Sequence, residues 1–304
     1  MAMDNLDTAG RGFLGDLTPS VLPVYQYRDR EQLLNTVKQA VATTSKATTS
    51  EWCLVEHVNN SIFTSEFLPA EEGPFASWSS YDAQLDRVLL RMVKSKAHEV
   101  ASETFHDVLH DAVKSMGMDR SLRPTGSATH HAAMGVKEGD KTWRPIRLPR
   151  GRSKDWPSVV LEVAFSESRA KLQSDIRYWL RASGGDVKVV ITLQINQHSP
   201  NITIENWGTQ GNTPVNHVHQ TVQTSRKGSK ITTTGSPLVI EFEKLFLRPP
   251  TEPRERNIHI DDEDLQFLAE SVWDDQGIIL APIIPLLEAD PATFLDSYKT
   301  IIIR

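Results

Sequence analysis

Apolar and amphipathic segments alternate in the middle of the chain. Residues 159–165 (VVLEVAF) are an almost continuous apolar run, and residues 187–195 (VKVVITLQI) are rich in β-branched apolar residues, as is typical of strands covered on both faces. Residues 168–182, which lie between them, carry Leu172 and Ile176 at helical spacing. A helix that connects two buried strands implies that the strands are parallel. The pattern therefore predicts a strand, a helix and a parallel strand at the centre of the fold.

The segments on either side of this unit differ in their periodicity. Residues 29–41 and 81–116 carry apolar residues at helical spacing, so we expect two helices there, the second one long. We expect a short hairpin over residues 53–58 and 61–67. Four further strands and a last helix are expected at residues 202–207, 215–224, 230–234, 237–247 and from Asp261 onward. The fold class that follows is α/β.

The length of the chain allows one elaborate domain, because 304 residues can bury a large core. Residues 1–20 show no periodicity, so we expect a mobile N-terminal arm there. We expect residues 21–304 to form a single domain. Within it we expect a core at about residues 81–200, a β-rich extension at residues 201–250 and a helical cap at residues 251–304.

Composition excludes several classes of protein. No stretch approaches 18 consecutive apolar residues, so we expect no membrane span. The first residues, MAMDNLDTAGRG, lack the basic and apolar regions of a secretory signal. Cys53 is the one cysteine, which excludes an intramolecular disulfide and a cysteine zinc site. Walker and GxGxxG loops are also absent from the sequence. We therefore expect a cytoplasmic or nuclear protein.

Two acidic residues occupy unusual places in the central unit. Glu162 lies inside the apolar run 159–165, and we expect Asp140 at a strand position as well. Aspartate and glutamate are depleted in strands and are rarely buried without a partner. A divalent metal ion shared by Asp140 and Glu162 would be such a partner.

The residues around both acids resemble the PD-(D/E)XK nuclease superfamily, in its divergent restriction-endonuclease-like branch with fungal members. The resemblance is close from residue 136 to residue 195. A K-x-x-D-x-x-x-R-P element consists of Lys137, Asp140, Arg144 and Pro145. A P-x-x-V-x-E-V-x-x-S-E-S element consists of Pro157, Val160, Glu162, Val163, Ser166, Glu167 and Ser168.

The resemblance implies a fold and a metal site. The fold would be a restriction-endonuclease-like mixed sheet flanked by helices, with a C-terminal antiparallel β extension and a capping helix. Asp140 and Glu162 would bind Mg²⁺ or Mn²⁺, and the backbone carbonyl of Val163 would complete the shell. We expect Glu103, on the helix before these strands, as a third ligand, with Glu99 one turn away as the alternative.

One catalytic position departs from the superfamily pattern. The superfamily places a lysine two residues after the glutamate, where it positions or activates the attacking water, but this chain has Ala164 there. Some branches move the basic residue onto the following helix, where Lys171 and Arg177 are the candidates. We favour Lys171 because the pKa of a lysine is tunable and that of an arginine is not. A helix salt bridge between Lys171 and Asp175 is the alternative interpretation.

A basic segment accompanies the two acids, although the whole chain has a net charge of −6. Seven basic residues between Lys137 and Lys154 are opposed by Glu138 and Asp140, which leaves five positive charges. We expect this loop beside the carboxylates to contact phosphates; a solvated, Arg- and Pro-rich loop is the alternative. The expected nucleic-acid contacts are Lys141, Arg144, Arg147, Arg150, Arg152 and Lys154.

These observations favour a Mg²⁺- or Mn²⁺-dependent nuclease-like protein that hydrolyses phosphodiester bonds of DNA or RNA. Asp140, Glu162 and Lys171 would be its catalytic residues. The alternative is a catalytically inactive nuclease-fold protein that binds nucleic acid or another protein, and Ala164 favours it. Nucleic acid is the expected partner, and a homodimer stays open.

Overall fold

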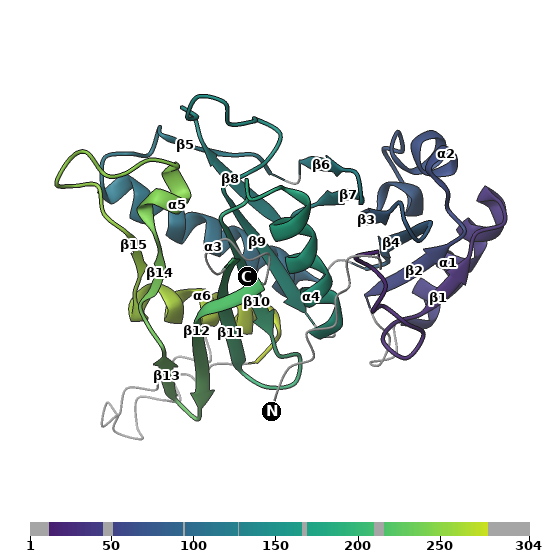
Figure 1. Ribbon diagram of the computed structural model, residues 1–304. Helices are drawn as coiled ribbons and strands as arrows, with labels where there is room; N and C mark the ends of the chain where they lie inside the picture. Colours follow the sequence, from purple (N-terminus) through teal and green to yellow (C-terminus); the bar gives the residue numbers. More distant parts are fainter. Residues whose placement is uncertain are drawn as a thin grey trace, which may run out of the picture.

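The computed structural model describes residues 12–44, 51–93, 95–126, 128–165, 169–209 and 216–278 of the chain (Figure 1). Its two larger sheets contain seven and six strands, and a third has two. Helices flank these mixed sheets, so the predicted α/β class is confirmed. In the described part of the chain, no helix has the length and apolar character needed to cross a membrane.

The seven-stranded sheet contains the predicted central unit. Its order is β13-β12-β11-β10-β9-β8-β5. The strands are β5 (Leu122–Pro124), β8 (Lys141–Pro145), β9 (Val159–Phe165), β10 (Val189–Ile195), β11 (Asn201–Thr209), β12 (Asn216–Lys227) and β13 (Lys230–Thr234). Strands β9 and β10 are parallel, with Glu162 opposite Thr192, and the other neighbours are antiparallel. Helix α4 (Arg169–Arg177) and the π-helical turn η3 (Tyr178–Ala182) connect them, so the predicted strand–helix–strand unit is confirmed.

The six-stranded sheet is formed by strands from the N-terminal half of the chain and has the order β1-β2-β4-β3-β7-β6. Its strands are β1 (Val24–Gln26), β2 (Trp52–Glu56), β3 (Trp78–Asp82), β4 (Arg87–Arg91), β6 (Thr129–Ala132) and β7 (Gly135–Glu138). Helix α1 (Arg30–Thr44) connects β1 to β2, which are parallel. The third sheet pairs β14 (Leu238–Ile240) with β15 (Ile258–Ile260).

The predicted long helix over residues 81–116 is wrong in its first part. Strands β3 and β4 pair antiparallel there, and helix α3 (Lys96–Ser115) begins only after its N-cap Ser95. Tyr81, Val88 and Leu90 are buried in the resulting sheet. Apolar residues at these spacings are compatible with a helix or with a strand. The segment forms strands because β4 pairs with β2 and β3 pairs with β7.

Two shorter predicted strands are helical instead. Residues 60–67 form α2 (Asn60–Ile62) and the π-helical turn η1 (Phe63–Phe67). Asn59 starts this segment because its side chain accepts a hydrogen bond from the Ile62 N–H. Of the strand predicted at 237–247, only β14 is extended, and α5 (Phe242–Phe246) follows it. Phe242 and Phe246 are buried by this helical turn, so the apolar residues that suggested a strand are buried in a helix instead.

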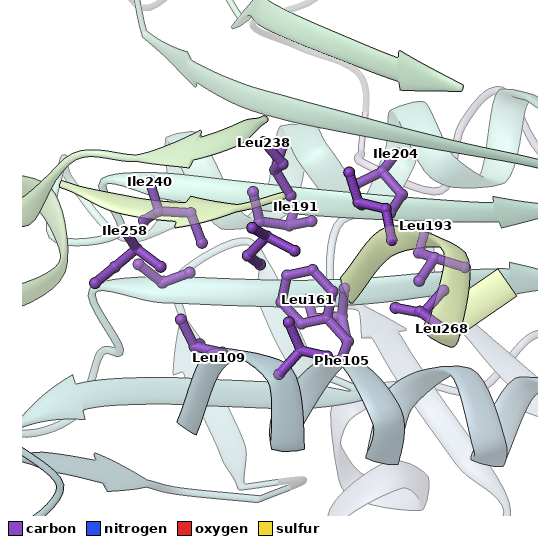
Figure 2. Close-up of a cluster of buried hydrophobic side chains, with 14 of the residues drawn as sticks. Phe105, Leu109, Leu161, Ile191, Leu193, Ile204, Leu238, Ile240, Ile258 and Leu268 are labelled. Carbon is purple, nitrogen blue, oxygen red and sulfur yellow. The ribbon is translucent and has the colours of Figure 1, made fainter. Parts of the chain in front are cut away.

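The two faces of β9 meet different helices. Leu161 packs with Phe105 and Leu109 of α3 in the larger hydrophobic cluster, which α6 (Asp262–Asp275) also joins (Figure 2). Val160 belongs to a second cluster, with residues of α4, η3 and the six-stranded sheet. Since side chains alternate along a strand, Glu162 points to the second face, between the two large sheets.

The described part of the predicted N-terminal arm is anchored. Residues 12–20 contribute buried side chains to the second cluster, beside Trp52 of β2 and Val160 of β9. The anchoring side chains are Phe13, Leu14 and Leu17. Residues 1–11 of the arm and residues 279–304 of the predicted cap lie outside the described residues.

Candidate functional site

The two large sheets are joined by a short turn that carries Asp140. Strand β7 ends at Glu138 in one sheet, and β8 begins at Lys141 in the other. Asp140 therefore lies in the turn, and its prediction as a strand residue is wrong. A Cβ on Gly139 would lie 2.9 Å from Cγ2 of Thr142 and 3.1 Å from Cζ2 of Trp179, so the close approach of the turn to η3 requires glycine.

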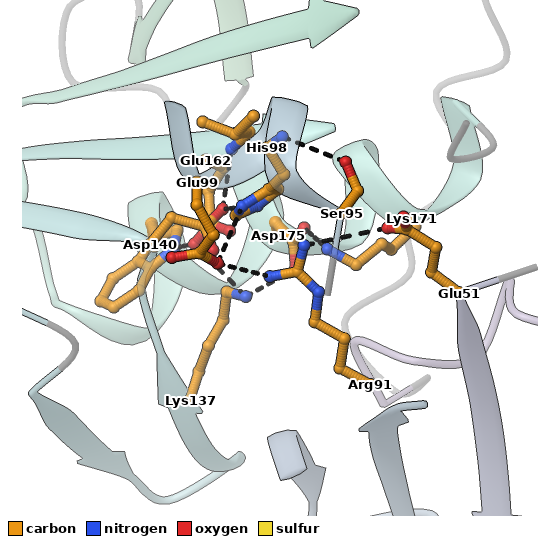
Figure 3. Close-up of polar contacts among 12 residues, drawn as sticks. Glu51, Arg91, Ser95, His98, Glu99, Lys137, Asp140, Glu162, Lys171 and Asp175 are labelled. Carbon is orange, nitrogen blue, oxygen red and sulfur yellow. Dashed lines mark hydrogen bonds and ion pairs between the residues drawn. The ribbon is translucent and has the colours of Figure 1, made fainter. Parts of the chain in front are cut away.

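The Asp140 carboxylate is held in place by one hydrogen bond and one ion pair. Its Oδ2 accepts a hydrogen bond from the Val163 N–H at 2.8 Å and lies 3.2 Å from Nε2 of His98 (Figure 3). Burial by itself would raise the pKa of Asp140, but the charges of His98, Lys171 and Arg91 outweigh it and hold the pKa below its ordinary value. The side chain is 18% exposed, so it remains within reach of solvent.

Glu162 immediately precedes Val163, whose N–H binds Asp140. Its electrostatic environment is nevertheless the opposite of that of Asp140. Its Oε1 accepts a hydrogen bond from Nε1 of Trp179 at 2.5 Å and lies 3.3 Å from Nζ of Lys137. Burial raises the pKa of Glu162 to about 8, and the carboxylates of Asp175 and Asp140 add to this effect against the charges of the lysines. Asp140 and Glu162 are thus neighbouring acids whose pKa values are displaced in opposite directions.

Two buried lysines converge on Asp175 of α4. The Nζ of Lys137 lies 2.7 Å from Oδ1 of Asp175, and the Nζ of Lys171 lies 2.9 Å from Oδ2. Burial would raise the pKa of Asp175, but Lys137 and Lys171 lower it below its ordinary value. The predicted i,i+4 pair between Lys171 and Asp175 therefore exists, and Lys137 from the other sheet adds a second cation. Sequence reasoning named Lys137 only as a motif residue and Asp175 only as a salt-bridge partner of Lys171, and it did not predict that they meet.

His98 is another site residue, to which sequence reasoning gave no role. It lies in the first turn of α3, where its N–H donates to the Ser95 side chain. Burial would lower the pKa of His98, but Asp140 and Glu99 raise it to about 9. Had Ser95 been taken as a helix N-cap, His98 would have been expected at a helix start instead of inside a long helix.

Two residues predicted for the site have other contacts. Glu103 accepts a hydrogen bond from Nζ of Lys141 at 2.6 Å, and its side chain is 61% exposed. Arg177 pairs with Asp16 at 2.9 Å and donates to the Phe13 carbonyl, so it anchors the N-terminal segment. The structure therefore does not bring Glu103 or Arg177 to the acidic pair.

The basic segment is displaced from the carboxylates. Strand β8 runs from Lys141, next to Asp140, to Pro145, so Arg147, Arg150 and Lys154 lie beyond its far end and are exposed. Five strand residues span about 17 Å. Arg152 instead pairs with Asp186 at 2.6 Å and donates to backbone carbonyls, so its side chain is a structural contact.

The acidic pair meets only part of the needs of a metal ion. In residues 12–278, apart from the gaps, no three or more His, Cys, Asp or Glu side chains form a group that could hold a metal. Mg²⁺ commonly uses one or two carboxylates and keeps several waters or substrate oxygens. Asp140 and Glu162 provide two carboxylates of the kind that such a site uses. Ser166, Glu167 and Ser168 of the second element lie outside the described residues.

Comparisons with known proteins place few constraints on the chain. No protein-family model matches it, and no curated protein matches it. One similar solved structure is that of a "putative nuclease belonging to DUF820" from Anabaena variabilis. It has 14% sequence identity and a TM-score of 0.40, over 67% of this chain and 97% of that chain. A similarity of this size assigns neither a family nor an activity.

Proposed function

We propose that the protein is a divalent-metal-dependent phosphodiesterase that acts on nucleic acid. The observation that carries the proposal is the pair formed by the partly exposed Asp140 and the buried Glu162 at the junction of the two large sheets. Burying an acid in a strand is costly unless a charge compensates it. The pKa of Glu162 is raised to about 8 because burial disfavours the charged carboxylate, and a bound cation would stabilise that charged form.

The chain's own groups would orient the two metal ligands. The Val163 N–H and His98 hold Asp140, and the Trp179 N–H holds Glu162, so neither carboxylate would have to be ordered on binding. A bound Mg²⁺ or Mn²⁺ would polarise the phosphodiester and lower the pKa of a water molecule. Glu103 has no place in this proposal, because it pairs with Lys141.

Two lysines from other elements take the place of the superfamily lysine, whose position is occupied by Ala164 in this chain. Lys137 lies directly against Glu162 and compensates part of its charge. Lys171 pairs with Asp175 and stacks on Trp52, with Nζ 4.1 Å from the ring centroid, and its charge also reaches Asp140 and Glu162. We propose that Lys171 orients the attacking water, while Lys137 keeps Glu162 in place.

A binding module without catalysis is the second candidate, and one observation favours it. Glu162 already contacts Trp179 and Lys137, and Asp175 already pairs with both lysines. Such a network satisfies its own charges without a metal ion. A nuclease fold with this internal pairing would still present surfaces to nucleic acid or to another protein.

Cleavage assays separate the two candidates. Purified wild type would be incubated with labelled single- and double-stranded DNA and RNA in Mg²⁺ or Mn²⁺, beside the isosteric variant Glu162→Gln. We expect cleavage by the wild type that is lost in Glu162→Gln and in EDTA. If no substrate is cut under any of these conditions, the catalytic proposal is wrong and the module is favoured.

A further inference from the structure

An arginine pair lies at the edge of the seven-stranded sheet. Strand β5 is the last strand of this sheet and pairs antiparallel with β8, which places Arg123 directly opposite Arg144 (Figure 1). Side chains directly opposite each other share one face of a sheet, and like charges in that position are destabilising. An anion bound between the two guanidinium groups would relieve this repulsion.

The described part of the chain places no carboxylate in ion-pair contact with Arg123 or Arg144. Arg123 is exposed, and Arg144 is partly buried, with a buried Nε that has no hydrogen-bond partner. A guanidinium group with unused donors is suited to phosphate oxygens, which it binds in a planar, two-point geometry.

Two more arginines extend the pair into a basic surface. The Ile146 N–H donates to the Ser121 carbonyl, so Arg147 and Arg120 follow on adjacent chain segments just beyond the pair. Both are exposed, and Oδ2 of Asp119 lies 4.0 Å from Nε of Arg120. Arg120, Arg123, Arg144 and Arg147 therefore gather four positive charges at this edge of the sheet, here called the arginine surface, in a chain that is acidic overall.

Strand register places this surface relative to Glu162. Thr142 lies opposite Val160, so Arg144 is two positions beyond it along β8 and Glu162 is two positions beyond it in the other direction along β9. The even-numbered residues of both strands share one face, so Arg144 and Glu162 lie on the same side of the sheet. Four strand positions correspond to about 14 Å.

We propose that this arginine surface binds the nucleic-acid backbone about four nucleotides away from the bond held at Asp140 and Glu162, taking about 3.4 Å per nucleotide. The choice of nucleic acid as the ligand rests on the proposed function. The substrate is then an oligomer, and fragments too short to span from Glu162 to Arg123 lose the contact. An acidic protein surface is the competing occupant.

Binding measured without cleavage tests the proposal. Fluorescence anisotropy in Ca²⁺ would compare labelled oligonucleotides of 3 and 12 residues, for wild type, Arg123→Glu and Lys230→Glu. Lys230 is a matched control because it is an exposed cation on β13, at the opposite edge of the same sheet. For the 12-mer we expect Arg123→Glu to weaken binding on the order of tenfold, with a salt slope smaller by about one, as for the loss of one phosphate contact. The 3-mer and Lys230→Glu should show no change.

The outcomes separate this inference from the proposed activity. Binding that depends on Arg123 in a protein that cuts nothing would support the surface and reject the phosphodiesterase. Cleavage that is lost in Glu162→Gln but is equal in Arg123→Glu at every oligonucleotide length would reject the surface alone. Equal losses in Arg123→Glu and Lys230→Glu, or binding of polyglutamate in place of oligonucleotides, would also overturn the proposal. Arg144→Gln gives a second variant if Arg123→Glu fails to fold.

Discussion

The Nζ of Lys137 lies 3.3 Å from Oε1 of Glu162, and these two residues belong to different sheets. Lys137 is fully buried on β7 of the six-stranded sheet, and Glu162 is buried on β9 of the seven-stranded sheet. A positive charge therefore stands beside Glu162 although position 164 is alanine. The contact makes the six-stranded sheet, most of which precedes the segment of resemblance, part of the candidate site.

Glu162→Gln should stabilise the metal-free protein, and more so as the pH rises from about 5 to about 8. Burial raises the pKa of Glu162 to about 8, so the folded state keeps a proton that the unfolded state releases near its ordinary pKa of about 4.3. The wild type thus loses stability as the pH rises through this range. Thermal unfolding in EDTA at several pH values measures the difference.

Glu205→Gln is the matched control for that experiment. Glu205 is also a strand glutamate that accepts a hydrogen bond from a tryptophan N–H, that of Trp207 at 3.1 Å, but it is only partly buried. Its substitution should change stability little at any pH. A Glu162→Gln effect that does not vary with pH would contradict the assignment of a raised pKa to Glu162.

Mn²⁺ or Mg²⁺ should raise the melting temperature of the wild type. The melting temperatures of Asp140→Asn and Glu162→Gln should not change on addition of the metal ion. A ligand that binds only the folded state stabilises by about 2.7 kcal/mol at one hundred times its Kd. The measurement is thermal unfolding with increasing metal concentration. Equal shifts in all three proteins would place the metal elsewhere, and no shift in the wild type at millimolar Mn²⁺ would count against a metal site.

Lys171→Met should slow cleavage by roughly 10²–10⁴, the range for loss of acid–base participation, without unfolding the protein. Asp175 would still have Lys137 as its partner, so no buried charge is left alone. Single-turnover cleavage together with urea unfolding measures both quantities. A rate equal to that of the wild type would remove Lys171 from the proposed mechanism.

Lys137→Met should instead act mainly on stability. Breaking a buried pair by removing one partner typically costs about 3–5 kcal/mol, and Lys137 contacts both Glu162 and Asp175. The double variant Lys137→Met, Glu162→Gln should recover part of the loss, because it also removes the acid that Lys137 contacts, while Asp175 keeps Lys171 as its partner. Urea unfolding of the single and double variants decides; a double variant less stable than Lys137→Met would reject this account.

The difference in unfolding free energy between the wild type and His98→Gln should become smaller as the pH rises from about 6.5 to about 9. The adjacent Asp140 raises the pKa of His98 to about 9, so the stabilisation is fully present below the ordinary pKa of histidine, about 6.5, and is lost as the pH passes 9. Unfolding in urea across this range is the measurement. A difference that grows with pH would mean that His98 is neutral beside Asp140.

The sequence by itself determined the strand–helix–strand unit around Glu162. The apolar run of β9 and the helical period of α4 are local signals, and parallel pairing with β10 follows from the connection between them. The same logic placed Glu162 in a buried strand and paired Lys171 with Asp175, because an i,i+4 contact needs only a helix.

Only the tertiary structure decided which other groups meet Glu162 and Asp140. Residues 81–91 became a hairpin because neighbouring strands were available to pair with them, and this moved the start of α3 to Ser95 and brought His98 to Asp140. Lys137 reached Glu162, and Arg123 came to lie opposite Arg144, through the packing and register of strands separated in the chain. Local periodicity carries no information about such contacts, since they depend on which sheet each strand joins and at which register.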